Sequence, residues 1–175
     1  MHEFYETNNG EAKMPSINLA RRPLLFGPLA IAFARDARAQ SEMAFLRVPD
    51  PDGVAWKANP LGAFLQSAVI DGDPTKPGLY VIRNKFAPGY LTRPHTHPFD
   101  RHIVVLSGTW LTGTGETFDP KSCVPLGPGS YMKHPAGALH YDGAGREACI
   151  IQVAGMGPIT TEYLRPQEGG FGRYE

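Results

Sequence analysis

Glycine and proline interrupt the sequence at short intervals from about residue 60 onward, and this punctuation constrains the fold most. The chain has 20 Gly and 17 Pro among 175 residues, about a fifth of the total against an average of roughly 12%. No low-complexity repeat accompanies them, so they predict tight turns and not disorder. The runs between the turns are rich in Val, Ile, Tyr, Thr and Trp, which suit pleated, half-buried strands. We therefore expect an all-β domain, a sandwich or barrel of short antiparallel strands.

The individual runs can be assigned from their composition and flanking turns. Strands are predicted at residues 61–70, 79–86, 102–106, 109–113, 131–134, 149–153 and 160–164. One short helix is predicted at residues 40–47, ahead of the strands. No linker or internal repeat divides residues 40–175, so a single domain is expected there. Gly169 and Gly170 fit no phosphate-binding loop and predict a flexible tail.

Residues 1–39 are predicted to be an export signal. Residues 23–34 carry no charge and follow Arg21 and Arg22; the run is too short to span a membrane but suits the apolar region of a signal peptide. The small residues Ala37 and Ala39 predict cleavage after Ala39. The paired arginines also suggest twin-arginine export. A periplasmic or secreted protein is expected; the alternative is an amphipathic helix packed on the mature domain.

Charge and cysteine content exclude several classes of protein. The formal net charge is zero, whereas a nucleic-acid binder or a polybasic membrane binder needs a basic field. Cys123 and Cys149 are too few for a disulfide scaffold and lack zinc-finger spacing. They either form one disulfide after export or remain free thiols. The expected partner is a small molecule, with no nucleic acid and, in the mature form, no membrane.

Histidine placement is the main functional signal. Of the 6 histidines, all but one lie between residues 95 and 140. His95 and His97 are two residues apart, so on a strand both imidazoles project from the same face. Pro94 and Pro98 flank the pair. A third imidazole from another strand would complete a metal site with open positions.

Two ordered motifs contain these histidines. Gly89 is followed, after five residues, by His95-Thr96-His97 and then by a turn glycine, Gly108; the second motif, GSYMKHPAGALH, contains Gly129, Pro135, Gly137 and His140. With this order and spacing, the sequence resembles a small single-domain bacterial member of the cupin superfamily over about residues 78–153. The resemblance implies a double-stranded β-helix, or jelly roll, with a metal held inside the barrel by His95, His97 and His140. It also implies a homodimer.

The sequence departs from the cupin pattern at the position of the metal-binding glutamate, which is Arg101 here. A guanidinium has no acceptor and stays charged, so it cannot bind a cation. Three outcomes stay open: three neutral histidines hold the metal, His102 or His134 adds a fourth ligand, or Arg101 and the histidines bind an anion without metal. Strand alternation should turn His102 away from the face of Arg101, whereas His134 can point inward and support the ligands. Ala144 replaces the closing asparagine.

This charge balance predicts the substrate class. A divalent metal on three neutral imidazoles, with Arg101 beside it, leaves a positive surplus that is costly in a barrel interior unless an anion binds. A small, partly apolar carboxylate, enolate or phenolate meets that need. Arg101 would pair with its charge. Tyr131 and Tyr141 are candidates for orienting it, although packing in the aromatic core is the favoured role for either residue.

The leading functional expectation is an exported cupin dioxygenase, an oxidoreductase with Fe(II) as the favoured metal and Mn, Zn or Ni as alternatives. Arg101, His134 and Tyr131 are its candidate catalytic residues, and no organic cofactor is expected. A non-catalytic cupin that binds a small molecule or metal is one alternative. Metal-assisted isomerase or lyase chemistry is another, since one fold hosts many reactions.

Overall fold

The structure is a computed structural model, and it describes residues 46–60 and 62–174. The predicted export signal lies outside the described residues, as does most of the predicted helix at residues 40–47. The last two residues of that segment, Leu46 and Arg47, are described and are not helical. Residues 47–175 form one compact unit.

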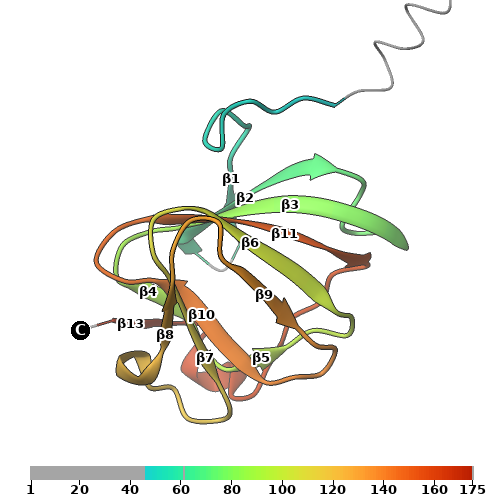
Figure 1. Cartoon of the computed structure of the whole chain (residues 1–175). Helices are drawn as coiled ribbons and strands as arrows, with labels where there is room; N and C mark the ends of the chain where they lie inside the picture. The colour runs from blue at the N-terminus through green and yellow to red at the C-terminus, as the bar shows by residue number, and fades with distance from the viewer. Residues whose placement is uncertain (1–45, 61, 175) are drawn as a thin grey trace, which may run out of the picture. The chain divides into compact units, whose positions relative to one another are not determined.

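One face of this unit is a sheet of six antiparallel strands in the order β1-β2-β3-β11-β6-β9 (Figure 1). The strands are β1 Lys57–Asn59, β2 Gly62–Asp71, β3 Gly78–Phe86, β6 Arg101–Ser107, β9 Tyr131–His134 and β11 Cys149–Gly157. The central strand β11 pairs with β3 along its whole length and with β6 on its other side. Each of these strands except β1 coincides with a run that was predicted from the sequence.

The second sheet has seven strands, with the path β12-β5-β10-β4-β13 and with β7 bridging β10 and β8. Its strands are β4 Tyr90–Thr92, β5 His95–Thr96, β7 Trp110–Thr114, β8 Val124–Leu126, β10 His140–Ala144, β12 Glu162–Tyr163 and β13 Phe171–Arg173. Two 3-10 turns complete the described elements, η1 Pro120–Ser122 and η2 Pro166–Glu168. The two antiparallel sheets confirm the predicted all-β jelly roll.

The predicted flexible tail after Gly170 is wrong. Residues Phe171–Arg173 form β13, which pairs antiparallel with β4. The phenyl ring of Phe171 also packs edge-on against Phe64 of β2, with ring centroids 4.7 Å apart. This pairing satisfies the backbone hydrogen bonds of the tail, which the glycine-rich sequence alone does not reveal.

The core lies between the sheets and follows strand alternation. On β6, Ile103 and Val105 are buried while His102 and Val104 are exposed, as the period of two requires. Trp110 of β7 is fully buried in the same apolar cluster. The interior face of β6 therefore continues from core residues directly to Arg101 at the start of the strand.

Gly108 shapes the tight turn between β6 and β7. Its φ is +70°, and a Cβ at this position would run into the backbone carbonyl of Ala148. Only glycine meets both demands without strain. The turn glycine of the first cupin motif thus has a structural reason in this chain.

The two cysteines are both free. Cys149 lies in the core of the six-stranded sheet, where burial raises its pKa to about 12. Cys123 follows η1, and burial raises its pKa to about 11. Of the two alternatives for these residues, the structure has the free thiols.

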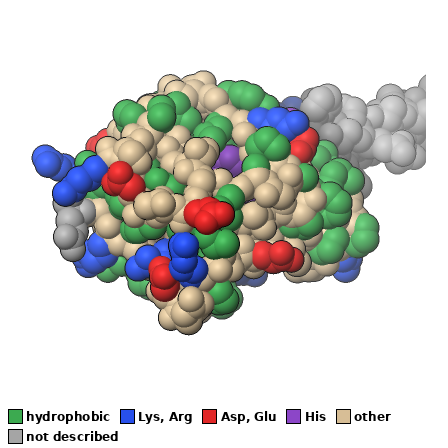
Figure 2. Space-filling view, turned by 90° about the horizontal axis from the view of Figure 1, so that it is seen from below, with side chains coloured by type: hydrophobic (Ala, Val, Ile, Leu, Met, Phe, Trp, Pro, Cys, Tyr) green, Lys and Arg blue, Asp and Glu red, His purple; other side chains and the backbone are tan. Residues whose placement is uncertain are grey.

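The surface is mixed in charge. Figure 2 shows one face on which acidic and basic side chains are scattered among hydrophobic and uncharged ones. Within the part of the chain that the structure describes, no helix has the length and apolar character needed to cross a membrane.

Candidate metal centre

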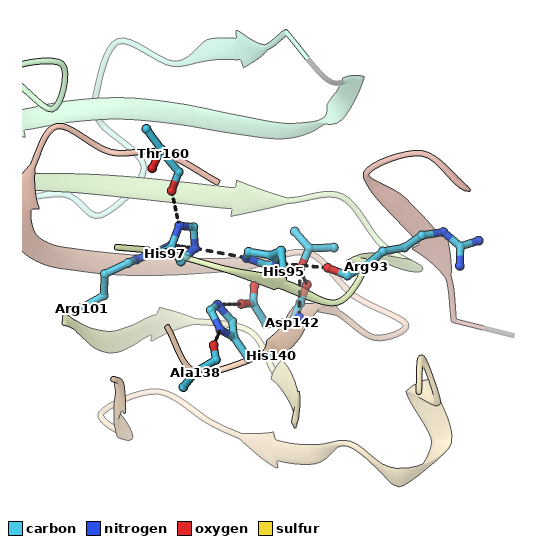
Figure 3. A network of polar contacts seen from close by, with 9 residues as sticks. Arg93, His95, His97, Arg101, Ala138, His140, Asp142 and Thr160 are labelled. Carbon is cyan, nitrogen blue, oxygen red and sulfur yellow. Dashed lines mark hydrogen bonds and ion pairs between the residues drawn. The ribbon is translucent and has the colours of Figure 1, made fainter. Parts of the chain in front are cut away.

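Strands of both sheets bring the predicted site residues together. In the seven-stranded sheet, His95 of β5 pairs directly with His140 of β10, and His97 follows β5 by one residue. In the six-stranded sheet, Arg101 of β6 pairs with His134 of β9. Figure 3 shows His97 and Arg101 close together, with His95 and His140 beside them. All five side chains are buried.

Each of the three predicted ligands is anchored through its Nδ1 by a backbone carbonyl. The Nδ1-to-oxygen distances are 2.7 Å from His95 to Arg93, 2.7 Å from His97 to Thr160, and 2.8 Å from His140 to Ala138. Because a carbonyl oxygen only accepts, each Nδ1 carries the proton and donates it. The Nε2 of each ring is consequently the unprotonated nitrogen, the form in which imidazole binds metals.

The three rings converge on one buried position. One ring nitrogen from each lies within 4.8 Å of the others, and the Nε2 atoms of His95 and His97 are 3.1 Å apart. Among the described residues, the Nε2 of His140 has no hydrogen-bond partner. Two acceptor lone pairs at such a distance repel each other unless a cation lies between them. Three neutral imidazoles in this arrangement fit a divalent metal ion.

Burial keeps these imidazoles neutral. It lowers the pKa of His97 to about 3, with the Arg101 charge as the second cause. Burial also lowers the pKa values of His95, His134 and His140. Since a protonated ring cannot bind a metal, the low pKa values favour the ligand form at neutral pH.

Arg101 lies inside the site, as predicted from its position in the motif. Its side chain is buried, and its Nη1 donates a hydrogen bond to the Nε2 of His97. Its Nε has no hydrogen-bond partner, and no carboxylate among residues 46–60 and 62–174 forms an ion pair with it. Burial lowers the pKa of the guanidinium, and the Asp142 carboxylate opposes that shift. A buried cation without a paired carboxylate is costly and favours binding of an anion.

His134 points inward, as the sequence allowed. Its ring packs at a tilt against His140, with centroids 3.8 Å apart, and neither of its nitrogens has a hydrogen-bond partner within the part of the chain that is described. His134, His140 and Asp142 form a second group of possible ligand atoms within 4.8 Å of one another. His134 is therefore placed to support His140 or to add a ligand.

Asp142 is a site residue that the sequence reasoning missed. It is buried, and its Oδ2 lies 4.0 Å from the Nε2 of His140. Burial raises the pKa of its carboxyl. The available signal was its spacing: Asp142 follows His140 by two residues, so both side chains share the inner face of β10.

His102 and Tyr131 lie on the outer face, away from the other candidates. His102 is exposed, as strand alternation predicted, and its Nδ1 is 2.7 Å from the hydroxyl of Tyr131. Tyr131 is 57% exposed and does not line the cavity beside the imidazoles. The structure thus does not bring Tyr131 to the site. Tyr141 is buried with Leu91 and Leu111, in the packing role.

A cavity of about 840 Å³ adjoins the imidazoles. One part of its wall is polar and charged, and contains Ser67, Asn84, Thr92, His95, His97, Arg101, Asp142 and Tyr163. The rest is largely apolar, with Leu65, Val69, Ile82, Phe86 and Ile159. A cavity of this size and lining suits a small organic molecule with one charged end.

Solved structures with the same architecture include two enzymes. The polyketide cyclase RemF from Streptomyces resistomycificus matches with a TM-score of 0.55 at 17% identity, over 69% of this chain and 86% of its own. The DMSP lyase DddQ from Ruegeria pomeroyi matches with a TM-score of 0.53 at 18% identity, over 78% of this chain and 69% of its own. A cupin-2 domain protein from Rhodospirillum rubrum matches with a TM-score of 0.52 at 14% identity, over 68% of this chain and 80% of its own. This chain has the cupin fold.

Sequence comparison agrees with that assignment. Germin-like protein subfamily 1 member 3 of Arabidopsis thaliana is 29% identical over 116 residues, which are 64% of this chain and 51% of that protein. The chain therefore spans about half the length of this curated relative. No family model matches the sequence.

Proposed function

We propose that this cupin is a metal-dependent enzyme that transforms a small organic anion in the cavity beside His95, His97 and His140. The observation that carries the proposal is the set of three Nδ1-to-carbonyl hydrogen bonds, which leave three Nε2 lone pairs directed at one buried position. Histidines that only fill a core have no need of a shared tautomer and a shared target. The names of two fold neighbours, a cyclase and a lyase, also support an enzymatic role.

Arg101 is the residue proposed to bind the substrate anion. Its guanidinium lies in the cavity wall next to the proposed metal ligands, and no carboxylate in the described part of the chain forms an ion pair with it. A substrate carboxylate or enolate would satisfy the fork of N–H donors with two charge-assisted hydrogen bonds. The apolar wall would hold the uncharged part of the molecule and exclude water, which strengthens these electrostatic contacts.

The reaction class proposed is that of an Fe(II)-dependent oxygenase. A bound divalent metal supplies Lewis acidity, and iron adds redox chemistry with dioxygen. The protein residues orient the anion, keep the ligand imidazoles neutral and stabilise negative charge that develops on the substrate next to Arg101. Export to the periplasm and assembly as a homodimer remain part of the proposal.

Oxygen uptake by reconstituted protein tests this function. Metal-free protein is loaded with Fe(II) under anaerobic conditions and exposed to oxygen with a panel of aliphatic and aromatic carboxylates. The corresponding amides serve as uncharged controls. We expect oxygen uptake with at least one carboxylate, not with its amide, and its loss in His140→Ala but not in the exposed control His102→Ala. Turnover without oxygen uptake would contradict the oxygenase class and favour an isomerase or lyase. Binding of a carboxylate without turnover would contradict an enzymatic function.

A further inference from the structure

We propose that Arg101 and the metal ion compete for the Nε2 of His97, so that an anion which draws Arg101 away strengthens metal binding. The proposal rests on the metal centre of the proposed function and adds an energetic coupling between the bound metal ion and the bound anion. Arg101 would then make metal retention depend on the presence of substrate.

The competition follows from the single lone pair on that nitrogen. The Nδ1 of His97 donates its proton to the carbonyl of Thr160, at 2.7 Å. The Nε2 is therefore the acceptor in the hydrogen bond from the Nη1 of Arg101. A ring nitrogen that accepts this hydrogen bond cannot use the same lone pair to bind a metal. Two positive charges at one position also repel each other.

The local environment of Arg101 explains why an anion would move it. Arg101 is only 9% exposed, and its Nε has no hydrogen-bond partner among the residues that the structure describes. If Arg101 left His97 without gaining another acceptor, its buried guanidinium would lose one more hydrogen bond, which is unfavourable. A carboxylate offers two acceptor oxygens and a compensating charge. When it binds, the position of the Arg101 guanidinium away from His97 becomes the more stable one.

The cavity gives the guanidinium a place to meet such an anion. His97 and Arg101 both line it, and its volume of about 840 Å³ exceeds the needs of a small carboxylate. The backbone of Arg101 is held on both sides, opposite Gly155 of β11 and His134 of β9. Only the long side chain needs to change rotamer, which is a small adjustment for arginine.

Coupling of this kind is reciprocal. If the anion raises the affinity for metal, the metal must raise the affinity for the anion by the same factor. Couplings between sites commonly amount to about 5-fold to 150-fold. We therefore expect acetate to tighten zinc binding to the wild-type chain by at least about 5-fold, and zinc to tighten acetate binding equally.

The experiment measures zinc affinity by competition with a chromogenic chelator, at pH 7 and constant ionic strength. Each chain is measured alone, with acetate, and with acetamide as the uncharged analogue. The variant is Arg101→Met, which keeps an unbranched side chain but removes the charge and the donors. Arg165→Met, at an exposed arginine that donates to the carbonyl of Glu116, is the matched control.

The expected results separate this proposal from the metal centre itself. Arg101→Met should bind zinc at least about 5-fold more tightly than wild type without acetate and should lose the acetate effect. Arg165→Met should behave as wild type. The competition is contradicted if wild type and Arg101→Met bind zinc equally tightly, or if acetate still tightens zinc binding in Arg101→Met. Neither result contradicts the metal centre. Absence of zinc binding in every chain overturns the metal centre, and the competition with it.

A second readout needs neither metal nor a variant. In the metal-free wild-type chain, acetate should shift the ring ¹⁵N resonance of the His97 Nε2, because its donor moves away, while acetamide leaves it unchanged. The His140 Nε2, which accepts no hydrogen bond from Arg101, serves as the internal reference. An acetate titration that leaves the His97 signal unmoved contradicts the proposal.

Discussion

Acid should destabilise this protein steeply, well before its carboxylates titrate. His95, His97, His134 and His140 are each between 3% and 6% exposed, and burial lowers the pKa of all four. In the unfolded chain the same residues titrate near their ordinary value of about 6.5. Between that pH and the lowered folded values, the unfolded state binds more protons, so stability falls as the pH falls.

The size of the effect follows from the number of groups. Each histidine that stays neutral only in the folded state contributes a loss of about 1.4 kcal/mol per pH unit below 6.5. The three most strongly shifted, His95, His97 and His134, amount to a loss of about 4 kcal/mol between pH 7.5 and 5.5, and His140 adds a smaller loss. Burial raises the pKa of Asp142, and uptake of a proton by its carboxyl in the folded state acts in the opposite direction. The histidine loss is a large part of the roughly 5–15 kcal/mol that stabilise an ordinary domain.

Urea unfolding of the metal-free chain, monitored by tryptophan fluorescence at several pH values, measures this loss. His134→Phe should reduce it by roughly 1.4 kcal/mol, because the ring of His134 packs at a tilt against the rings of Trp110 and His140 and phenylalanine can occupy that position. If the free energy of unfolding changed by less than about 1.5 kcal/mol over this pH range, the claim that these histidines are buried and neutral in the folded state would be refuted.

Two further substitutions test the placement of other residues. Gly108→Ala should lower the free energy of unfolding by about 2 kcal/mol or more, because φ is +70° and the added Cβ meets the carbonyl of Ala148; a stability equal to wild type in a thermal melt would contradict the turn. Tyr131→Phe should change stability by less than about 0.5 kcal/mol and leave zinc affinity unchanged, because Tyr131 contacts His102 on the outer face. A marked loss of zinc affinity on chelator competition would instead place Tyr131 at the site.

The longer strands of the fold could be predicted because their residues show local patterns. The apolar runs on β2, β3, β6 and β11 are long enough to be recognised as strands between the flanking turns. By contrast, β4, β5 and β13 are two or three residues long, and their pairing is set by neighbours distant in the sequence. The β13 strand pairs with β4 across some 80 residues of chain, so no local signal marks it.

The candidate site shows the same division. The His95 and His97 pair and the inward side of His134 follow from motif and strand period. Asp142 was missed because a single buried carboxylate has no sequence signature, although its spacing from His140 placed it on the same face. The contact between Arg101 and His97 spans only four residues, but it depends on how the chain turns between β5 and β6, which residue types alone do not specify.

Zinc content after equilibration and dialysis tests the central claim most directly. We predict about one zinc per chain for the wild type, with loss of the metal in each of His95→Ala, His97→Ala and His140→Ala and full retention in His102→Ala. Zinc retained at the wild-type level by His140→Ala, or no zinc held by the wild type, would contradict a centre built from these three imidazoles.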